Sequence, residues 1–421
     1  MSAEQSRLPG GLRAFRHRDF RLFWTAQLVS LVGTWMQSVA QSWLVLQLTN
    51  SPFRLGLVGT LQFTPMLLFS FVAGALADRL PKRRLIIGSQ IVLFVQALCL
   101  AALIEFGHVQ YWHVALLALV YGIANTIDMP TRQAFLVEMV GKSDLMNAIA
   151  LNSGMFNAAR IVGPALAGVL IARWGMAPAF FFNALSFLPV IVVLTAIHAQ
   201  GLPRAQSGRR LQAEIGEGLG YAARTPRILL TLAMVVAVSA FLFNYNIFVP
   251  LLARDVLHQD ASGFGLLMTT LGVGALTGAV ALALTGRGRP PVAALAVPAL
   301  VQGVATALLA AAGSVRLAAA LLLITGFCGI LFMAGSNSTL QLTVPDELRG
   351  RVMSLYTFVF AGVTPFGSLL VGSVAEAFGI RTSLVVSSAA GVLAVVGLLL
   401  WWNGRDRGPS LTAPREVEGP A

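Results

Sequence analysis

Ionisable residues are rare inside the apolar runs of this chain, and each one there needs a chemical explanation. Asp128 lies late in one run, and Arg132 follows four residues later on the same face of a helix. A carboxyl group whose proton affinity changes with burial and with a nearby guanidinium can carry a proton. Arg160 lies within the next run, where an arginine costs about 2.5–3.5 kcal/mol on insertion scales. These three residues are the candidates for proton coupling.

Each of these candidates also has a structural interpretation. Asp128 and Arg132 can form a fixed ion pair near a gate. Arg160 can bond backbone carbonyl groups beside a predicted helix break at Gly163 and Pro164, instead of contacting a substrate or an acid. Glu105 and Glu376 fall near the ends of other runs, where an interfacial position is expected.

Uncharged polar residues within the apolar runs form a second group of candidates. In the first run they recur at steps of three and four residues, which places them on one face of a helix. Such a face either lines a wet cavity or joins packed helices. The predicted cavity-lining residues are Gln27, Thr34, Gln37, Gln41, Asn125, Asn157, Asn244, Asn246 and Asn337.

The composition identifies the kind of element that must position these residues. Of the 421 residues, 57% are hydrophobic and only 11% are charged, whereas a soluble domain carries about 25% charged residues. The sequence therefore predicts a membrane protein. The net charge of +12 comes from bases in short clusters between apolar runs, so nucleic-acid binding is not expected.

Nothing in the sequence indicates an enzyme or a bound cofactor. The two cysteines lie inside apolar runs and suit neither a disulfide framework nor a metal site. The five histidines lack metal-ligand spacing, and no phosphate-binding Walker loop is present. ATP is therefore not the expected source of energy.

Twelve apolar runs are long enough to cross a bilayer, which takes about 20 residues in a helix. If the N-terminus is inside, 23 of the 29 basic residues fall in inside segments and five in outside segments. We therefore expect a multi-pass protein of the bacterial cytoplasmic (inner) membrane, with both termini in the cytoplasm. The runs are roughly 22–46, 55–77, 85–106, 112–130, 146–172, 177–198, 228–252, 263–285, 291–312, 316–340, 352–377 and 382–402.

The two halves of the chain resemble each other weakly. The segment "GPALAGVLIARWG" (163–175) aligns without a gap to "GSLLVGSVAEAFG" (367–379), with three glycines matched. A polar, basic segment separates six runs from six. The expected fold is an all-α membrane protein with 12 transmembrane helices in two pseudo-symmetric six-helix bundles. Its expected parts are 1–198, a cytoplasmic linker 199–227, and 228–421 with a cytoplasmic tail.

The turn between the second and third runs reads "GALADRLPKRR" and holds one acid among four bases. Bases anchor such a turn to the inner leaflet, but they do not account for the acid. The order resembles the signature loop of the major facilitator superfamily, G-x-L-A-D-R-x-G-R-[RK], with Pro81 where the second glycine is usual. The resemblance implies a latch that closes the cytoplasmic side through ion pairs and a helix cap. Its residues are Gly74, Asp78, Arg79, Lys82 and Arg83.

Other segments resemble the enterobactin-exporter-like branch of the same superfamily, including "MPTRQAFLVEMV" and "LMNAIALNSGMFNAARIVGPALAG". Gly154, Gly163 and Pro164 partly resemble the antiporter motif of the fifth helix, with Ala159 where a glycine is usual. That branch contains siderophore exporters and macrolide or multidrug pumps. The resemblance implies a secondary active transporter that exports a small, drug-like or siderophore-like molecule by proton antiport, without a cofactor.

Two alternatives share the same sequence features. One is a lysophospholipid flippase of the same fold, which would work without a proton gradient. The other is a non-transporting membrane sensor or partner protein, which would give no flux at all. The expected partners are a small-molecule substrate and the lipid bilayer, the chain acting as a monomer.

Overall fold

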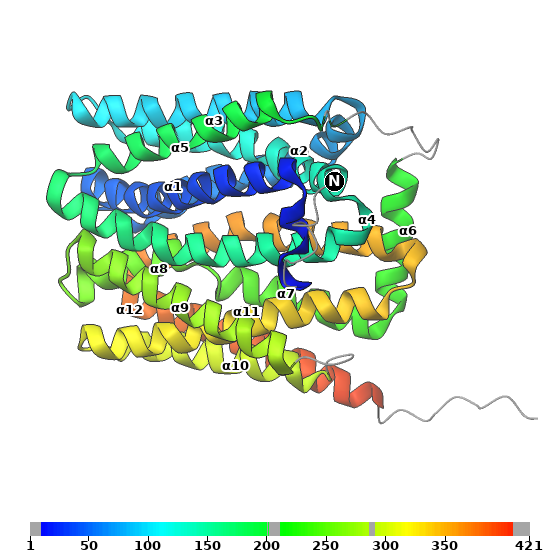
Figure 1. Cartoon of the computed structure of the whole chain (residues 1–421). Coiled ribbons are helices and arrows are strands. Elements are labelled where there is room, and N and C mark those ends of the chain that lie inside the picture. The colour runs from blue at the N-terminus through cyan, green and yellow to red at the C-terminus, as the bar shows by residue number, and fades with distance from the viewer. Residues whose placement is uncertain (1–9, 200, 202–210, 286–290, 407–421) are drawn as a thin grey trace, which may run out of the picture.

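Long helices lie side by side along a common axis in the computed structural model of the chain (Figure 1). The structure describes residues 10–199, 201, 211–285 and 291–406. Within these residues every regular element is a helix, which confirms the predicted all-α class. The first elements, called the N-terminal helices below, are η2 (Gly10–Arg16), α1 (Arg18–Thr49), α2 (Pro52–Arg79), α3 (Lys82–Glu105), α4 (Tyr111–Trp174) and α5 (Ala177–Ala196).

The remaining elements form a second group beside the first. Helix α6 (Leu211–Arg224) lies across one end of the bundle in Figure 1, and we call this the linker end. The opposite end, where α1 turns into α2, is called the far end. The C-terminal helices are α7 (Pro226–Phe241), α8 (Tyr245–Leu251), η3 (Leu252–Val256), α9 (Ala261–Thr285), α10 (Ala293–Leu308), η4 (Leu309–Ala311), α11 (Val315–Thr343) and α12 (Asp346–Asp406).

Helices α4 and α12 contain a sharp turn each. They comprise 64 and 61 residues, which would make straight rods about 90–95 Å long at 1.5 Å per residue. Each has one residue with non-helical angles, Gly141 at a φ of 69° and Gly379 at a φ of 81°. A positive φ is readily adopted only by glycine, so these two glycines allow the chain to change direction.

Eight helices in the described part of the chain are long and apolar enough to cross a membrane. They include α4 and α12, counted once each. Helices α1 and α2 coincide with the first two predicted runs. The chain is therefore a multi-pass membrane protein, as its composition predicts.

The predicted run 228–252 is not one continuous helix. Helix α7 ends at Phe241, α8 begins at Tyr245, and the residues between them leave the helical path. The Nδ2 of Asn244 donates to the carbonyl of Ala240 at 2.8 Å, and its Oδ1 accepts from Ser368 of α12 at 3.3 Å. The interruption is therefore held by side-chain bonds that replace part of the helical ladder.

Part of the predicted linker 199–227 folds as a helix. Arg351 of α12 donates to Glu217 of α6 at 2.7 Å, and Ala222 is buried in the core of the C-terminal helices. These contacts place α6 against the C-terminal helices at the linker end.

The hydrophobic core is continuous at the far end and divided at the linker end. One cluster at the far end contains side chains from both groups, with Trp43 of α1 stacked on Phe264 of α9 at 5.8 Å. Towards the linker end, one cluster belongs to the N-terminal helices and includes Phe135, while another belongs to α6 and the C-terminal helices and includes Phe332. The two groups are thus joined firmly at one end only.

Glycines make the junction at the far end close. A Cβ atom built on Gly372 of α12 would lie 2.8 Å from the carbonyl oxygen of Pro52 and 3.1 Å from the Cα of Gly56. A Cβ on Gly265 of α9 would lie 2.9 Å from the Cα of Gly168 in α4. Small residues allow this backbone approach between membrane helices.

The same helix faces separate towards the linker end. Residues seven apart share a helix face. A Cβ atom built on Gly362 of α12 would lie 2.7 Å from Cδ1 of Leu67 in α2. Seven residues later in α2, a Cβ on Gly74 would meet no described atom within 4 Å. On α4, Gly168 packs against α9, whereas Gly154 is exposed and has nothing within 4 Å.

Candidate functional site

A buried acid and base join α3 to α4 within the N-terminal helices. Asp128 is 4% exposed, and its Oδ1 accepts hydrogen bonds from Ser89 Oγ at 2.7 Å and Gln90 Nε2 at 3.2 Å. Its Oδ2 pairs with Nε of Arg132, one helical turn later. The structure therefore brings together two of the three residues predicted for proton coupling, with two polar partners on α3 that were not among the candidates.

The surroundings of this pair are partly apolar and partly open to the side of the bundle. The guanidinium of Arg132 lies over the ring of Phe23, 5.9 Å from its centroid, and Arg132 Nη1 is buried without a hydrogen-bond partner among the described residues. A groove of about 280 Å³ between α3 and α4 has Arg84 and Ser89 among its lining residues. Ser89 thus links the groove to the carboxylate of Asp128.

Arg160 lies at the junction of the two helix groups. Its guanidinium lies over the indole of Trp35 in α1, 5.8 Å from the ring centroid. Its carbonyl oxygen would be 3.0 Å from a Cβ on Gly272 of α9. Within the described residues its guanidinium has neither an ion pair nor a hydrogen bond. The structure therefore does not bring Arg160 together with Asp128 and Arg132.

The predicted helix break at Gly163 and Pro164 is wrong. Within the described α4, only Gly141 has non-helical angles, so the helix continues through both residues. Gly163 instead lets α1 approach, since a Cβ there would lie 2.8 Å from the carbonyl of Val32 and would collide with Cβ of Trp35. The missing N–H of Pro164 is tolerated because neighbouring helices support a membrane helix at such a point.

The polar residues on one face of α1, which we call the polar stripe, are Gln27, Thr34, Gln37 and Gln41 among the predicted residues. Some of them bond to neighbouring helices and others do not. Gln37 is buried, donates to Gln96 of α3 at 3.1 Å, and accepts from Asn183 of α5 at 2.6 Å. Gln41 donates to Gln62 of α2 at 3.5 Å. These glutamines join α1 to its neighbours, and lining of a cavity by the stripe stays a prediction.

Other members of the stripe lie nearer the linker end or bond to their own helix. Thr34 is partly exposed, and its hydroxyl donates to the carbonyl of Ser30 at 2.9 Å. Gln27 is buried, and its Oε1 has no hydrogen-bond partner in the part of the chain that the structure describes. On α4, Asn157 is buried as well. Its Nδ2 donates to the carbonyl of Ser153 at 2.9 Å, and its Oδ1 accepts from none of the described residues.

The remaining cavity candidates are dispersed. Asn244 is buried at the break before α8, whereas Asn246 is exposed. Asn337 is partly exposed and accepts from Gln341 Nε2 at 2.5 Å on the same helix. Asn125 is partly exposed on α4, one turn before Asp128.

The predicted gate residues lie at the linker end, where α2 ends and α3 begins. Lys82 Nζ pairs with Glu138 of α4 at 2.8 Å, and the backbone N–H of Lys82 donates to the carbonyl of Gly201 at 2.8 Å. Arg83 donates to the carbonyls of Thr195 at 2.7 Å and Ile197 at 3.3 Å. Arg83 thus caps the C-terminal end of α5, where a cation is favourable. Arg79 is exposed, and the side chain of Asp78 lies outside the described part of the chain.

A second anchor at the linker end was not predicted. Asp144, three residues after the turn at Gly141 and outside the apolar runs, accepts from Arg16 at 2.6 Å and contacts Nε2 of His17 at 2.8 Å. Asn147 accepts from the N–H of Ala14 at 2.8 Å. These bonds tie η2 to α4. The hydrogen bond with His17, followed by that with Arg16, holds the pKa of Asp144 below its usual value.

We expect Asp144→Asn to loosen η2, because Arg16 and His17 lose their charged acceptor. Hydrogen exchange of residues 10–17 should become severalfold faster, whereas Asp260→Asn at the far end should leave it unchanged. A lowered folded-state pKa means that the bond stabilises the protein above about pH 4, the value of an unfolded aspartate, and that this stability is lost as the pH falls further. Unaltered exchange in Asp144→Asn would contradict the anchor.

The far end carries an ionic contact between the groups that we call the clasp. Glu376 of α12 accepts from Ser51 Oγ at 2.8 Å and from the N–H of Phe53 at 3.1 Å, at the N-terminus of α2. Arg254 of η3 donates to the carbonyl of Leu46, near the C-terminus of α1, at 3.3 Å. Each charge faces the helix end of opposite polarity. The C-terminal helices thus hold the α1–α2 turn from both sides.

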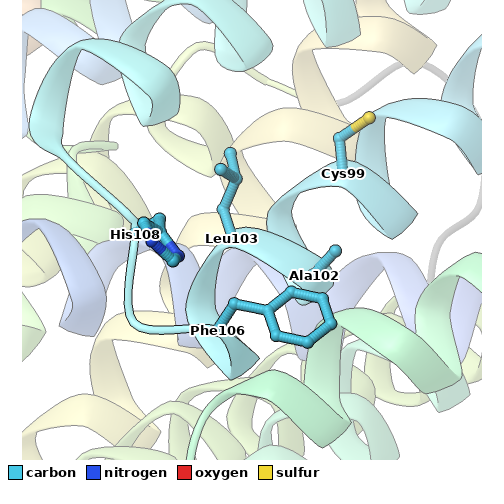
Figure 2. Close-up of a pocket in the computed structure, with 5 residues that line it drawn as sticks. All are labelled: Cys99, Ala102, Leu103, Phe106 and His108. Carbon is cyan, nitrogen blue, oxygen red and sulfur yellow. The ribbon is translucent and has the colours of Figure 1, made fainter.

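An apolar groove near the end of α3 lies apart from these polar residues. It has a volume of about 380 Å³ and is lined by Cys99, Ala102, Leu103, Phe106 and His108 (Figure 2). Phe106 is strongly exposed, and the groove contains no charged group. Its position and lining suit contact with lipid rather than chemistry.

Solved structures of transporters share the arrangement of these helices. A bacterial homologue of the human lysosomal transporter Spinster superimposes with a TM-score of 0.71 and 12% identity, over 91% of this chain and 94% of that one. The nucleoside transporter NupG gives the same score and identity, over 91% and 99%. At this identity the likeness establishes the fold alone, an all-helical transporter fold.

The chain is thus a transporter of the major facilitator superfamily and not an enzyme. It belongs to the family described as transmembrane secretion effectors, whose profile matches residues 10–406. The multidrug efflux pump Tap of Mycolicibacterium fortuitum is 30% identical over 89% of this chain and 94% of its own length. The staphyloferrin A transporter of Staphylococcus aureus is 25% identical over 86% and 90%.

Proposed function

We propose that the chain is a secondary active exporter of a small drug-like or siderophore-like molecule, driven by proton antiport. The observation that carries this proposal is the hydrophobic core that is continuous at the far end and divided at the linker end. A transporter that alternates between two openings must be able to separate its halves at one end while the other stays packed. This arrangement corresponds to a state open at the linker end.

The proposed topology has twelve spans in two six-helix halves. Helices α4 and α12 each cross twice. Each contains about 90 Å of helix and turns at a glycine, which is enough for two crossings of a hydrocarbon layer about 30 Å thick and a connection between them. Adding α1 and α2 to the other long helices then gives six spans before α6 and six after it. We propose halves at 1–198 and 228–421, a linker at 199–227, and a cytoplasmic linker end because the basic residues gather there.

The names of the relatives favour export. The matched proteins include a multidrug efflux pump and a siderophore transporter, and the alignments span most of both chains. We therefore propose that a substrate enters from the cytoplasmic linker end and leaves at the far end after the halves rock. In that second state the signature loop with Gly74 and Arg79 would close the linker end.

Asp128 is the proposed proton carrier. It is a buried carboxyl group whose charge is balanced by Arg132 and by hydrogen bonds from α3. Protonation would release Arg132 and weaken the α3–α4 contact, which supplies a link between a proton and the packing of the helices. Ser89 donates to Asp128 and also lines the neighbouring groove, whose other lining residues apart from Arg84 are apolar.

The test is uptake of tetracycline and of a hydroxamate siderophore into inside-out proteoliposomes with an acidic interior. We expect the wild type to accumulate at least one of them and Asp128→Asn to lose the dependence on the pH gradient while keeping downhill exchange. Removing one member of a buried pair costs about 3–5 kcal/mol, so Asp128→Asn/Arg132→Gln serves as the variant without an unpaired charge. Glu105→Gln, an exposed carboxylate of α3, is the control.

Gradient dependence retained in both Asp128 variants would move proton coupling to another residue. Absence of accumulation by the wild type for both compounds, with or without a gradient, would contradict export of these two classes.

A further inference from the structure

We propose that Arg160, Trp35 and Tyr245 form a subsite for the carboxylate of an amphipathic, aromatic substrate. This deepens the proposed function and rests on it, since it assigns the substrate class of the same transporter. The inference starts from the guanidinium of Arg160, which within the described residues has no counterion and no hydrogen-bond acceptor. A charge that is costly inside a membrane and has no protein partner indicates a ligand of opposite sign.

The charge balance within the spans supports an anion. The carboxylate of Asp128 already forms an ion pair with Arg132 and accepts hydrogen bonds from Ser89 and Gln90. Glu376 is bonded at the far end, and Glu105 is exposed at the end of α3. Arg160 therefore remains as a positive charge at the junction of the groups, which attracts a carboxylate and repels a cationic drug.

The position of Arg160 makes it reachable from the linker end. Three contacts join α4 to α9 along one face. Gly168 packs on Gly265, the carbonyl of Ile161 accepts from Thr269, and the carbonyl of Arg160 lies opposite Gly272. Two turns further towards the linker end, Gly154 is exposed and open. Arg160 thus lies where the packed part of the junction ends, and its side chain is partly exposed.

An aromatic surface beside the guanidinium indicates the rest of the ligand. Trp35 holds it by a cation–π contact, and Phe156 lies 5.6 Å from Trp35 in an edge-on arrangement with 46% of its surface exposed. Gly163 makes this possible, because only a glycine there leaves room for Trp35. A planar substrate ring can pack on this aromatic surface while its carboxylate reaches Arg160.

Tyr245 adds a second donor from the C-terminal helices. It is buried in the core cluster of the far end, which also contains Met36, the neighbour of Trp35 in α1. Its hydroxyl oxygen accepts from Gln302 Nε2 at 2.7 Å, so the hydroxyl hydrogen can be donated to another acceptor. A carboxylate between Arg160 and Tyr245 would therefore bond to both helix groups and would link substrate binding to their relative position.

Equilibrium binding to the purified full-length chain in lipid nanodiscs tests this, with two matched pairs of probes. The pairs are nalidixate with its methyl ester and 2-naphthoate with its methyl ester, which differ in the negative charge. We expect the wild type to bind at least one acid about tenfold more tightly than its ester, as a charge-assisted bidentate contact predicts. Arg160→Gln should abolish the difference without weakening ester binding.

Further variants keep the test decisive. Arg160→Lys retains the charge and should keep a reduced preference, and Tyr245→Phe should weaken binding of the acid alone by a few fold. Arg173→Gln, an exposed arginine of the same helix, should change nothing. The proposal is overturned if the wild type prefers neither acid, or if the preference is undiminished in Arg160→Gln or Arg160→Lys. Binding needs no proton gradient, so its failure is distinguishable from failure of export.

Discussion

Gly56→Leu is expected to force α2 and α12 apart at the far end and to abolish transport. A Cβ atom at this position would collide with the carbonyl oxygen of Ser368 and would lie 3.2 Å from the Cα of Gly372. Both obstacles belong to the backbone of α12, which cannot rotate away as a side chain can. The two helices must therefore separate, and the state sealed at the far end becomes unfavourable.

The separation can be measured with spin labels at Phe53→Cys and Phe378→Cys, in a background where Cys99 and Cys328 are replaced. Gly56→Leu should lengthen the label distance and reduce accumulation of substrate by more than about tenfold, because overpacking costs about 1–3 kcal/mol or more. Gly397→Leu is the matched control, since this exposed glycine of α12 has nothing within 4 Å of a Cβ among the described residues. An unchanged distance with normal transport in Gly56→Leu would refute the role of the glycine junction.

The sequence predicts the helices well because hydropathy alone determines which segments enter the membrane. It also predicts turns where a glycine or proline stands, as at Pro81. The interruption between α7 and α8 could not be predicted, because Leu242, Phe243 and Asn244 include no residue that breaks a helix. It depends on Ser368, more than a hundred residues away, which bonds Asn244 only in the folded protein.

At Gly163 and Pro164 the sequence predicts an interruption of the helix that the structure does not have. Their types predict a break, yet α4 stays helical because α1 and α9 pack against it at that point. Tertiary packing here overrides the local preference of proline, which is weaker in membrane helices supported by neighbours.

Polarity within apolar runs identifies part of the candidate site. The rule selects Asp128, Arg160 and Gln37, and applied further it would also have selected Gln90 and Gln96. It does not select Trp35 or Tyr245, because aromatic residues are common in membrane helices and only their contacts distinguish these two. The partner of each polar residue likewise depends on which helices are adjacent, and a single sequence does not contain that information.

Glu376 illustrates the same limit at the far end. A carboxylate near the end of an apolar run is expected at a membrane interface, and Glu376 is indeed exposed. Its function as one half of the clasp depends on Ser51 and Phe53, about 325 positions earlier in the chain. Only the packing of α2 against α12 brings them together.

The double variant Glu376→Gln/Arg254→Gln is expected to shift the protein towards a state open at the far end. Glu376 satisfies two donors at the start of α2, and Arg254 lies by the carbonyl end of α1, so both charges stabilise the α1–α2 turn only while the groups are closed. At about 1 kcal/mol for each of the two charged side chains, the shift in the equilibrium between states is roughly 30-fold.

The same pair of spin labels, at Phe53→Cys and Phe378→Cys, would report this shift as a larger population of long distances. Because the contacts of Glu376 are exposed, whereas that of Arg254 is partly buried, high salt should produce part of the same change in the wild type and little further change in the double variant. Asp260→Asn/Arg316→Gln is the matched control, since it removes the same charges at the far end without a contact between the groups. If neither high salt nor the double variant changes the distance distribution, the glycine contacts alone close this end and the clasp contributes nothing.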